Sequence, residues 1–283
     1  MSYVFLMLAV CLISFQQVIK KLYSVKHKGG VITFTAASVV FGLAYFCVTS
    51  KEFNYTPELL WYSVAFSITY SLAVVGSILA IKTGPLSLSS LVTSYSLIIP
   101  TFYGIIVLGE PTKLMLYVGI VLLVISIFFV NMEKKGEEKK ITLKWILCAL
   151  LSFLANGACS TVQKVQQLDF NGLYKNESMI IALAISSVLL FISAFIIEGK
   201  EVKTVIKKGF WFYALCGVAN AVTNYFTILL ATRMPASITF PVLSAGGIVL
   251  AAIISVFGFK EKLSKMQWVG MILGIASIVA LNL

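Results

Sequence analysis

Residues 110–131, E-P-T-K-L-M-L-Y-V-G-I-V-L-L-V-I-S-I-F-F-V-N, return in altered form at residues 261–282, E-K-L-S-K-M-Q-W-V-G-M-I-L-G-I-A-S-I-V-A-L-N. At this offset of 151 positions, eight of the 22 aligned residues are identical. In the first stretch they are Glu110, Met115, Val118, Gly119, Leu122, Ser126, Ile127 and Asn131. A shared apolar composition alone does not produce so many identities in one register. The sequence therefore predicts two copies of one structural unit.

The composition predicts a membrane protein. Hydrophobic residues make up 59% of the chain, charged residues 12%, and the mean hydropathy is +0.98. A soluble domain averages about 25% charged residues. The five cysteines lie in apolar runs without paired spacing, so we expect no disulfide framework and no metal site. The net charge of +11 comes from lysines in short loops, which favours membrane lipid over nucleic acid as a partner.

Ten segments are long and apolar enough to cross a bilayer, which takes about 20 residues. The first five run over residues 3–22, 30–49, 59–82, 86–108 and 113–131. The second five run over residues 142–164, 176–197, 210–232, 236–258 and 265–282. We therefore predict a first repeat at 1–131, a polar linker at 132–141 and a second repeat at 142–283.

An odd number of spans in each copy means that the second copy enters the membrane from the opposite side. The expected fold is an all-α membrane protein of ten transmembrane helices, built as two inverted five-helix repeats. Inverted repeats give two related arrangements around a site near the membrane midplane, as in secondary transporters.

The distribution of basic residues predicts the orientation. Loops 1–2, 3–4, 5–6, 7–8 and 9–10 carry 17 lysines and arginines, whereas the loops of the other face carry 5. The basic loops 1–2, 5–6 and 7–8 are therefore expected in the cytoplasm, with both termini outside.

Two lysines near span ends extend polar stripes. Gln16 lies one helical turn before Lys20, and Asn156 and Ser160 precede Lys164 at the same spacing of four. These residues are candidate substrate contacts, because ammonium groups in a central cavity attract a carboxylate or phosphate. The alternative is that both lysines extend to the lipid headgroups.

The eighth span carries a longer stripe. Asn220, Thr223, Asn224 and Thr227 fall on one helix face, and Thr69 is the counterpart of Asn220 in the third span. Amides that face lipid have no partners, so this face turns inward. It lines a substrate cavity or joins helices by hydrogen bonds.

Spans four and nine contain helix-breaking residues, which predict interruptions. Pro100 lies in the fourth span, near the candidate substrate contacts Tyr95 and Tyr103. The ninth span contains Pro241 and the pair Gly246 and Gly247. A proline removes a backbone donor and bends a helix, so these four residues are candidate hinges. A packing kink without functional motion is the alternative.

Glu110 and Glu261 precede the last span of each copy. Each carboxylate is expected to stabilise the N-terminus of the following helix. A gate contact with Lys82 or Arg233 is the alternative.

Short motifs also recur between the copies. The pattern G-E-P-x(7)-G at 109–119 has the echo K-E-K-x(7)-G at 260–270, and K-T-G-P at 82–85 is matched by R-M-P-A at 233–236. With ten spans in two halves, they resemble the drug/metabolite transporter superfamily of the EamA type, over essentially the whole chain. The resemblance implies a secondary carrier with a central cavity formed by both halves. Ten-span relatives are usually drawn with cytoplasmic termini, whereas the basic residues of this chain predict the reverse.

The favoured hypothesis is an alternating-access transporter for a small organic molecule, such as an amino acid or a similar metabolite, without a cofactor. A non-transporting scaffold or receptor subunit is the alternative, and it predicts polar stripes satisfied by one another. Membrane enzymes are disfavoured because the only aspartate, Asp169, and the only histidine, His27, lie outside the spans. A G-x-x-x-x-G-K-[ST] loop for ATP is absent from the sequence.

Overall fold

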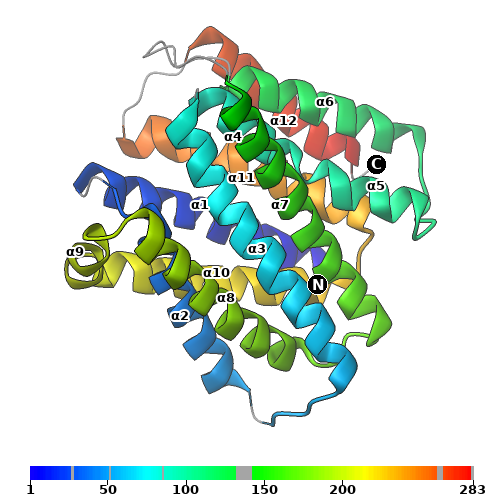
Figure 1. Ribbon diagram of the computed structural model, residues 1–283. Coiled ribbons are helices and arrows are strands. Elements are labelled where there is room, and N and C mark those ends of the chain that lie inside the picture. The colour runs from blue at the N-terminus through cyan, green and yellow to red at the C-terminus, as the bar shows by residue number, and fades with distance from the viewer. Residues whose placement is uncertain (27–28, 51, 85, 132–141, 260–263, 282–283) are drawn as a thin grey trace. The chain divides into compact units, whose positions relative to one another are not determined.

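The computed structural model describes residues 1–26, 29–50, 52–84, 86–131, 142–259 and 264–281, and these form twelve helices and no strand (Figure 1). The first six helices are α1 (Ser2–Lys26), α2 (Val31–Thr49), α3 (Pro57–Thr83), α4 (Leu86–Tyr95), α5 (Ile98–Ile106) and α6 (Leu114–Asn131). The other six are α7 (Leu143–Asp169), α8 (Lys175–Ile197), α9 (Glu201–Lys208), α10 (Phe210–Ala231), α11 (Ala236–Phe259) and α12 (Lys265–Leu281).

Each predicted span coincides with one helix, except that the segment 86–108 is divided between α4 and α5. Within the described ranges, eight segments are long and apolar enough to cross a membrane, while α6 and α12 form shorter apolar helices. The chain is therefore an all-helical, multi-pass membrane protein. Ten crossings and the inverted arrangement remain predictions, and the linker 132–141 lies outside the described residues.

Two helical features were not predicted. The helix α7 continues five residues beyond the expected end at Lys164, through the polar segment V-Q-Q-L-D. The short helix α9 occupies the loop between α8 and α10. Both segments are too polar to belong to a lipid-facing span, so hydropathy alone does not identify them.

The helices form two compact units, each with segments from both halves of the chain. Unit 1 contains Met1–Val75 and Val162–Thr232, and unit 2 contains Gly76–Thr161 and Arg233–Leu283.

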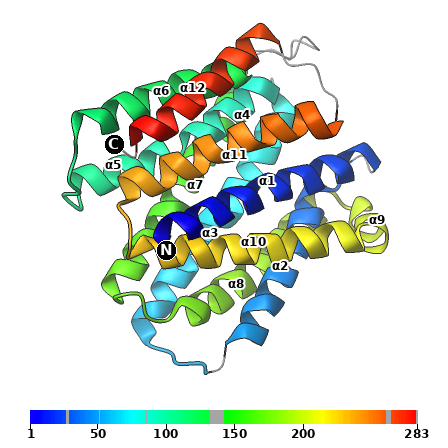
Figure 2. The same ribbon diagram turned by 180° about the vertical axis from the view of Figure 1, so that it is seen from behind.

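In unit 1, α2 packs against both α8 and α10, and α1 packs against α10 (Figure 2). The crossing of α2 and α10 depends on Gly217, where an added Cβ would lie 2.1 Å from the Ser38 carbonyl oxygen. A cluster of buried residues fills the adjoining space, and it consists of Ile19, Tyr23, Phe34, Ala37, Val205, Tyr213 and Cys216.

In unit 2, α6 packs along α12, and the pair meets at the two glycines that the repeat aligns. An added Cβ would lie 3.0 Å from the Leu281 backbone nitrogen at Gly119 and 2.8 Å from the Val130 backbone nitrogen at Gly270. Leu281 and Val130 are themselves aligned by the offset of 151. The beginning of each helix therefore contacts the end of the other, so α6 and α12 run antiparallel.

Candidate functional site

A hydrogen-bonded group of side chains joins α1 to α10 within unit 1. Asn220 Nδ2 donates to Gln16 Oε1 at 3.1 Å, and Gln16 Nε2 donates to Thr223 Oγ1 at 3.0 Å. Asn224 Nδ2 donates to Asn220 Oδ1 at 2.9 Å and to its backbone oxygen at 3.0 Å. We call Gln16, Asn220, Thr223 and Asn224 the amide network. These contacts agree with the inward orientation expected for the polar face of the eighth predicted span, which is α10.

The amide network has a buried side and an accessible side. Gln16 and Thr223 are 6% and 8% exposed, whereas Asn220 and Asn224 are partly exposed. No described residue donates a hydrogen bond to Asn224 Oδ1. Hydrogen bonding between helices, one of the two sequence-based alternatives, is therefore present. The accessible side leaves an amide oxygen available to a ligand.

Lys164 does not extend to the lipid headgroups. Its side chain is 5% exposed, and Nζ donates to the Ala231 carbonyl oxygen at 2.6 Å. Ala231 is the last residue of α10, where carbonyl groups lack helical partners and the helix dipole favours a cation. The headgroup alternative is therefore wrong for Lys164. Its role as a substrate contact stays a prediction.

The other predicted contacts of unit 1 lie apart from these bonds. Lys20 is exposed on α1, one turn beyond Gln16. Thr69 Oγ1 donates to the carbonyl oxygens of its own helix, Ala65 at 2.7 Å and Phe66 at 3.0 Å. Thr69 thus has no bond to the amide network, although its aligned partner Asn220 is a member.

Unit 2 holds the remaining predicted contacts around the junction of α4 and α5. Asn156 Nδ2 donates to Ser96 Oγ at 2.5 Å, and Ser160 Oγ donates to the Asn156 carbonyl oxygen at 3.2 Å. Tyr95 closes α4 and donates from its hydroxyl to the Val124 carbonyl oxygen at 2.8 Å. Tyr103 is half-buried on α5. Asn156 therefore reaches the turn at which the fourth span is interrupted.

The interruption predicted for the fourth span is confirmed, and that predicted for the ninth is wrong. Turn residues separate α4 from α5, and Pro100 lies in the first turn of α5, where its missing N–H leaves no helical bond unmade. In contrast, α11 is helical throughout, including at Pro241, Gly246 and Gly247. Packing on α5, α6 and α12 supports α11 on several sides, which offsets the lost backbone bond. The hinge roles stay predictions.

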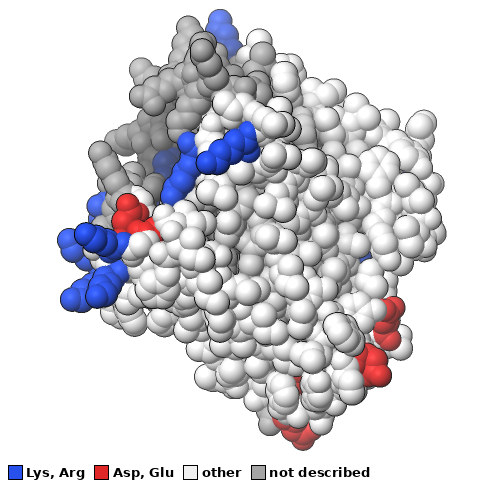
Figure 3. Space-filling model, in the orientation of Figure 1, with Lys and Arg blue, Asp and Glu red and all other residues white. Residues whose placement is uncertain are grey.

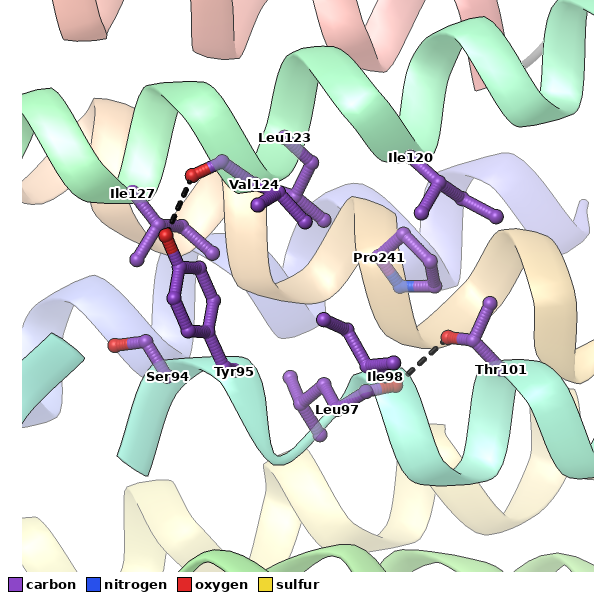
Figure 4. Close-up of a pocket in the computed structure, with 10 residues that line it drawn as sticks. All are labelled: Ser94, Tyr95, Leu97, Ile98, Thr101, Ile120, Leu123, Val124, Ile127 and Pro241. Carbon is purple, nitrogen blue, oxygen red and sulfur yellow. Dashed lines mark hydrogen bonds between the residues drawn. The ribbon is translucent and has the colours of Figure 1, made fainter. Parts of the chain in front are cut away.

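Beside the α4–α5 junction lies a cavity of about 10 Å³ (Figure 4). Its polar lining groups are already engaged: Ser94 Oγ donates to the Ser90 carbonyl oxygen, Thr101 Oγ1 to that of Leu97, and Tyr95 to that of Val124. The other lining residues are Leu97, Ile98, Ile120, Leu123, Val124, Ile127 and Pro241. This cavity is an apolar packing gap and offers little to a polar substrate.

A second cavity of about 10 Å³, room for roughly one water molecule, lies in unit 1 between α3, α7 and α8. Gln163 and Gln166 line it, and the Nε2 atom of each is buried without a hydrogen-bond partner among the described residues. Gln166 Oε1 accepts a bond from Gln167 Nε2 at 2.5 Å. These amides are not among the contacts predicted from the sequence. The segment Q-K-V-Q-Q at 163–167 is their only signal in the sequence, and the predicted span ends within it, at Lys164.

Two carboxylates cap helix N-termini that are distant in sequence. Glu110 accepts from the backbone nitrogens of Ala236 at 2.6 Å and Ser237 at 2.9 Å, at the start of α11. The expectation that Glu110 stabilises the following helix is therefore wrong, because the chain turns the carboxylate towards α11. Glu261 lies outside the described residues.

In unit 1, Glu198 has the corresponding role at the start of α2. Its carboxylate accepts from the Ile32 and Thr33 backbone nitrogens at 2.7 and 2.8 Å, and from Thr33 Oγ1 at 2.7 Å. The side chain is 8% exposed, so its charge is stabilised mainly by these donors and the helix dipole.

Among the described residues, no three His, Cys, Asp or Glu side chains gather as a metal centre requires. The polar groups described above are amides, hydroxyls, one buried ammonium and capping carboxylates. Such groups bind and orient a polar molecule.

Comparisons with known proteins agree with the geometry. Residues 143–283 match the model of the EamA-like transporter family. One solved crystal structure aligns with 100% of this chain and 98% of its own, with a TM-score of 0.78 and 13% identity, which shows a shared fold alone. A search of curated proteins finds no match.

Proposed function

Since the chain belongs to the EamA-like transporter family, whose members are membrane transporters of the drug/metabolite superfamily, we propose that it moves a small organic metabolite across the membrane by alternating access. The proposed substrate is an amino acid or a molecule of similar size and polarity. The proposal rests on the accessible side of the amide network, because this side presents polar atoms that can bind a substrate within a multi-pass membrane protein.

The chemistry of the amide network suits a substrate with both donors and acceptors. Asn224 Oδ1 can accept from an ammonium or amide group. The exposed ammonium of Lys20, on the helix that carries Gln16, can attract a carboxylate. A zwitterion supplies both partners, which is why an amino acid-like molecule is preferred to a purely apolar drug.

The crossing of α6 and α12 supports the inverted repeat on which alternating access depends. Gly119 approaches Leu281, and its aligned partner Gly270 approaches Val130, the aligned partner of Leu281. Reciprocal contacts of this kind are typical of elements related by a two-fold axis. The matched family range, 143–283, also nearly coincides with the predicted second repeat.

Transport is tested with purified protein in liposomes, by uptake and counterflow of a panel of labelled amino acids and related metabolites. Replacement of Asn224 by leucine is expected to lower transport about tenfold, the effect of losing roughly 1.4 kcal/mol of ligand interaction. Thr227→Val is the matched control, since Thr227 is one turn away and bonds only to the Thr223 carbonyl oxygen.

A scaffold without transport is the second candidate, and a specific observation favours it: Gln16, Asn220 and Thr223 satisfy one another. It predicts no counterflow of any panel member by folded protein, and equal thermal stability with and without each compound. Counterflow that Asn224→Leu abolishes and Thr227→Val retains would exclude it.

The proposed location is the cell membrane, with the basic loops in the cytoplasm. Single cysteines are placed in the loop between α8 and α10 and in the loop between α7 and α8. Their labelling from either side of intact cells tests this orientation. Labelling of the loop between α8 and α10 from outside the cell would contradict this orientation.

A further inference from the structure

The helix α9 has one buried face and one strongly basic face. Val202 and Val205 are 1% and 6% exposed, and Val205 packs in the cluster that includes Tyr23. The opposite face carries exposed lysines (Figure 3), which are Lys200, Lys203, Lys207 and Lys208. We call these four residues the α9 basic surface.

The two acidic residues nearest to the α9 basic surface in the sequence, Glu198 and Glu201, accept hydrogen bonds from backbone groups. Glu201 Oε2 accepts from the Gly30 backbone nitrogen at 2.8 Å, and the buried Glu198 caps α2. None of the four lysines has a hydrogen bond or ion pair with another described residue. Their positive charge is therefore available to an external anion.

Large apolar side chains border the α9 basic surface. Ile206, Phe210 and Trp211 are 43%, 47% and 74% exposed. Aromatic side chains beside basic ones are characteristic of the membrane–water interface, where apolar groups enter the lipid and ammonium groups stay at the headgroups. A freely diffusing anion would leave this apolar border in water.

We propose that the α9 basic surface binds the phosphate groups of anionic phospholipids in the leaflet that the charge distribution predicts to be cytoplasmic. The lysines attract the headgroups, and the apolar border fixes the depth of α9 in the interface. This contact holds α9, and through Glu198 and Glu201 the start of α2, at the membrane surface. The proposal does not depend on transport or on its substrate.

Native mass spectrometry of the purified protein, titrated with phosphatidylglycerol or phosphatidylcholine of identical acyl chains, tests the proposal. We expect tighter binding of phosphatidylglycerol. The double variant Lys203→Gln with Lys207→Gln should weaken that binding about 30-fold, since each lysine near an anionic surface contributes roughly a fivefold change. Phosphatidylcholine binding should not change.

Two further variants keep the result unambiguous. Lys203→Arg with Lys207→Arg preserves the charge and should bind phosphatidylglycerol like the wild type. Lys113→Gln with Lys175→Gln removes two charges from loops predicted on the opposite membrane face and should also have no effect. Thermal unfolding of each variant verifies that it is folded.

Three outcomes would overturn the proposal: equal affinity for the two lipids, equal weakening by the Lys113 and Lys175 double variant, and displacement of the lipid by millimolar glycerol phosphate. The last outcome would identify a site for a soluble phosphate. A failed transport assay would leave the lipid result standing, so the two proposals are tested separately.

Discussion

Two helix crossings, one in each unit, are held by different interactions. The crossing of α1 and α10 is joined by side-chain amides, which leave Asn224 Oδ1 accessible. The crossing of α6 and α12 is joined by close backbone approach at Gly119 and Gly270, with one bond from Ser126 Oγ to the Gly270 carbonyl oxygen at 2.6 Å. We expect the close backbone contact to contribute more stability without offering ligand chemistry, whereas the amide pairing keeps polar groups available.

The units are more alike at the helix ends that carboxylates cap. Glu198 in unit 1 and Glu110 in unit 2 each accept backbone N–H groups at the start of a helix distant in sequence. Glu198 also accepts a hydrogen bond from Thr33 Oγ1, and it is more deeply buried than Glu110. The carboxylate cap is therefore expected to contribute more stability in unit 1 than in unit 2.

Of the two crossings, the one between α6 and α12 should show the larger effect. Replacement of Gly270 by valine places a Cβ 2.8 Å from the Val130 backbone nitrogen and should lower the free energy of unfolding by about 3 kcal/mol. Thermal unfolding in detergent measures the change. Gly258→Val is the control, because the nearest atom to a Cβ there is Ile254 Cγ2 at 3.6 Å. Equal losses at both positions would show that backbone proximity is not the cause.

The next effect separates the two carboxylate caps. Glu198→Gln keeps the side-chain size but removes the charge and one acceptor, and should cost about 2 kcal/mol of unfolding free energy. Glu110→Gln, at a partly exposed position, should cost about 1 kcal/mol, because water can compensate part of the lost interaction. The comparison between the units fails if Glu110→Gln lowers the unfolding temperature as much as Glu198→Gln.

A smaller effect is expected in the amide network. Gln16→Leu removes the bonds to Asn220 and Thr223 and should cost about 1 kcal/mol, the usual scale for hydrogen bonds between membrane helices. Chemical denaturation or thermal unfolding reports the loss. Cys11→Leu, at an exposed position of the same helix, should be neutral. A cost above that of Gly270→Val would reverse the ranking of the two crossings.

The smallest effect is expected at the cavity of unit 1. Gln163→Met replaces an amide whose Nε2 has no described partner with an apolar side chain of similar size. Stability should rise by about 0.5 kcal/mol, since an unsatisfied buried donor is removed. A decrease instead would indicate that a water molecule bonds to Gln163 in this cavity.

The positions of the apolar helices followed from the sequence because they depend on local properties. Hydropathy over about 20 residues decides which segments enter a membrane, and the predicted spans agree with the helices closely. The helix α9 and the end of α7 escaped this criterion. Both segments are rich in charged or amide side chains, so their mean hydropathy is low.

The sequence predicted which polar residues belong to the candidate site, but not which of them form hydrogen bonds with one another. The stripe on α10 was identified by its helical spacing, yet nothing in that spacing indicates Gln16 as the partner of Asn220, 204 positions away. The broken fourth span was predicted correctly from its proline, whereas the same argument failed for Pro241. Neighbouring helices decide whether a proline interrupts a helix, and they are not visible in the local sequence.

The sequence by itself determined that this is a multi-helix membrane protein with polar faces on particular helices, and it predicted an internal repeat, because hydropathy and periodicity act along the chain. Only the tertiary structure decided that Lys164 caps α10 from a buried position and that Glu110 caps α11 instead of the following helix. These outcomes depend on how the helices cross and rotate against one another. Packing across more than sixty intervening residues fixes both choices, and no local pattern encodes them.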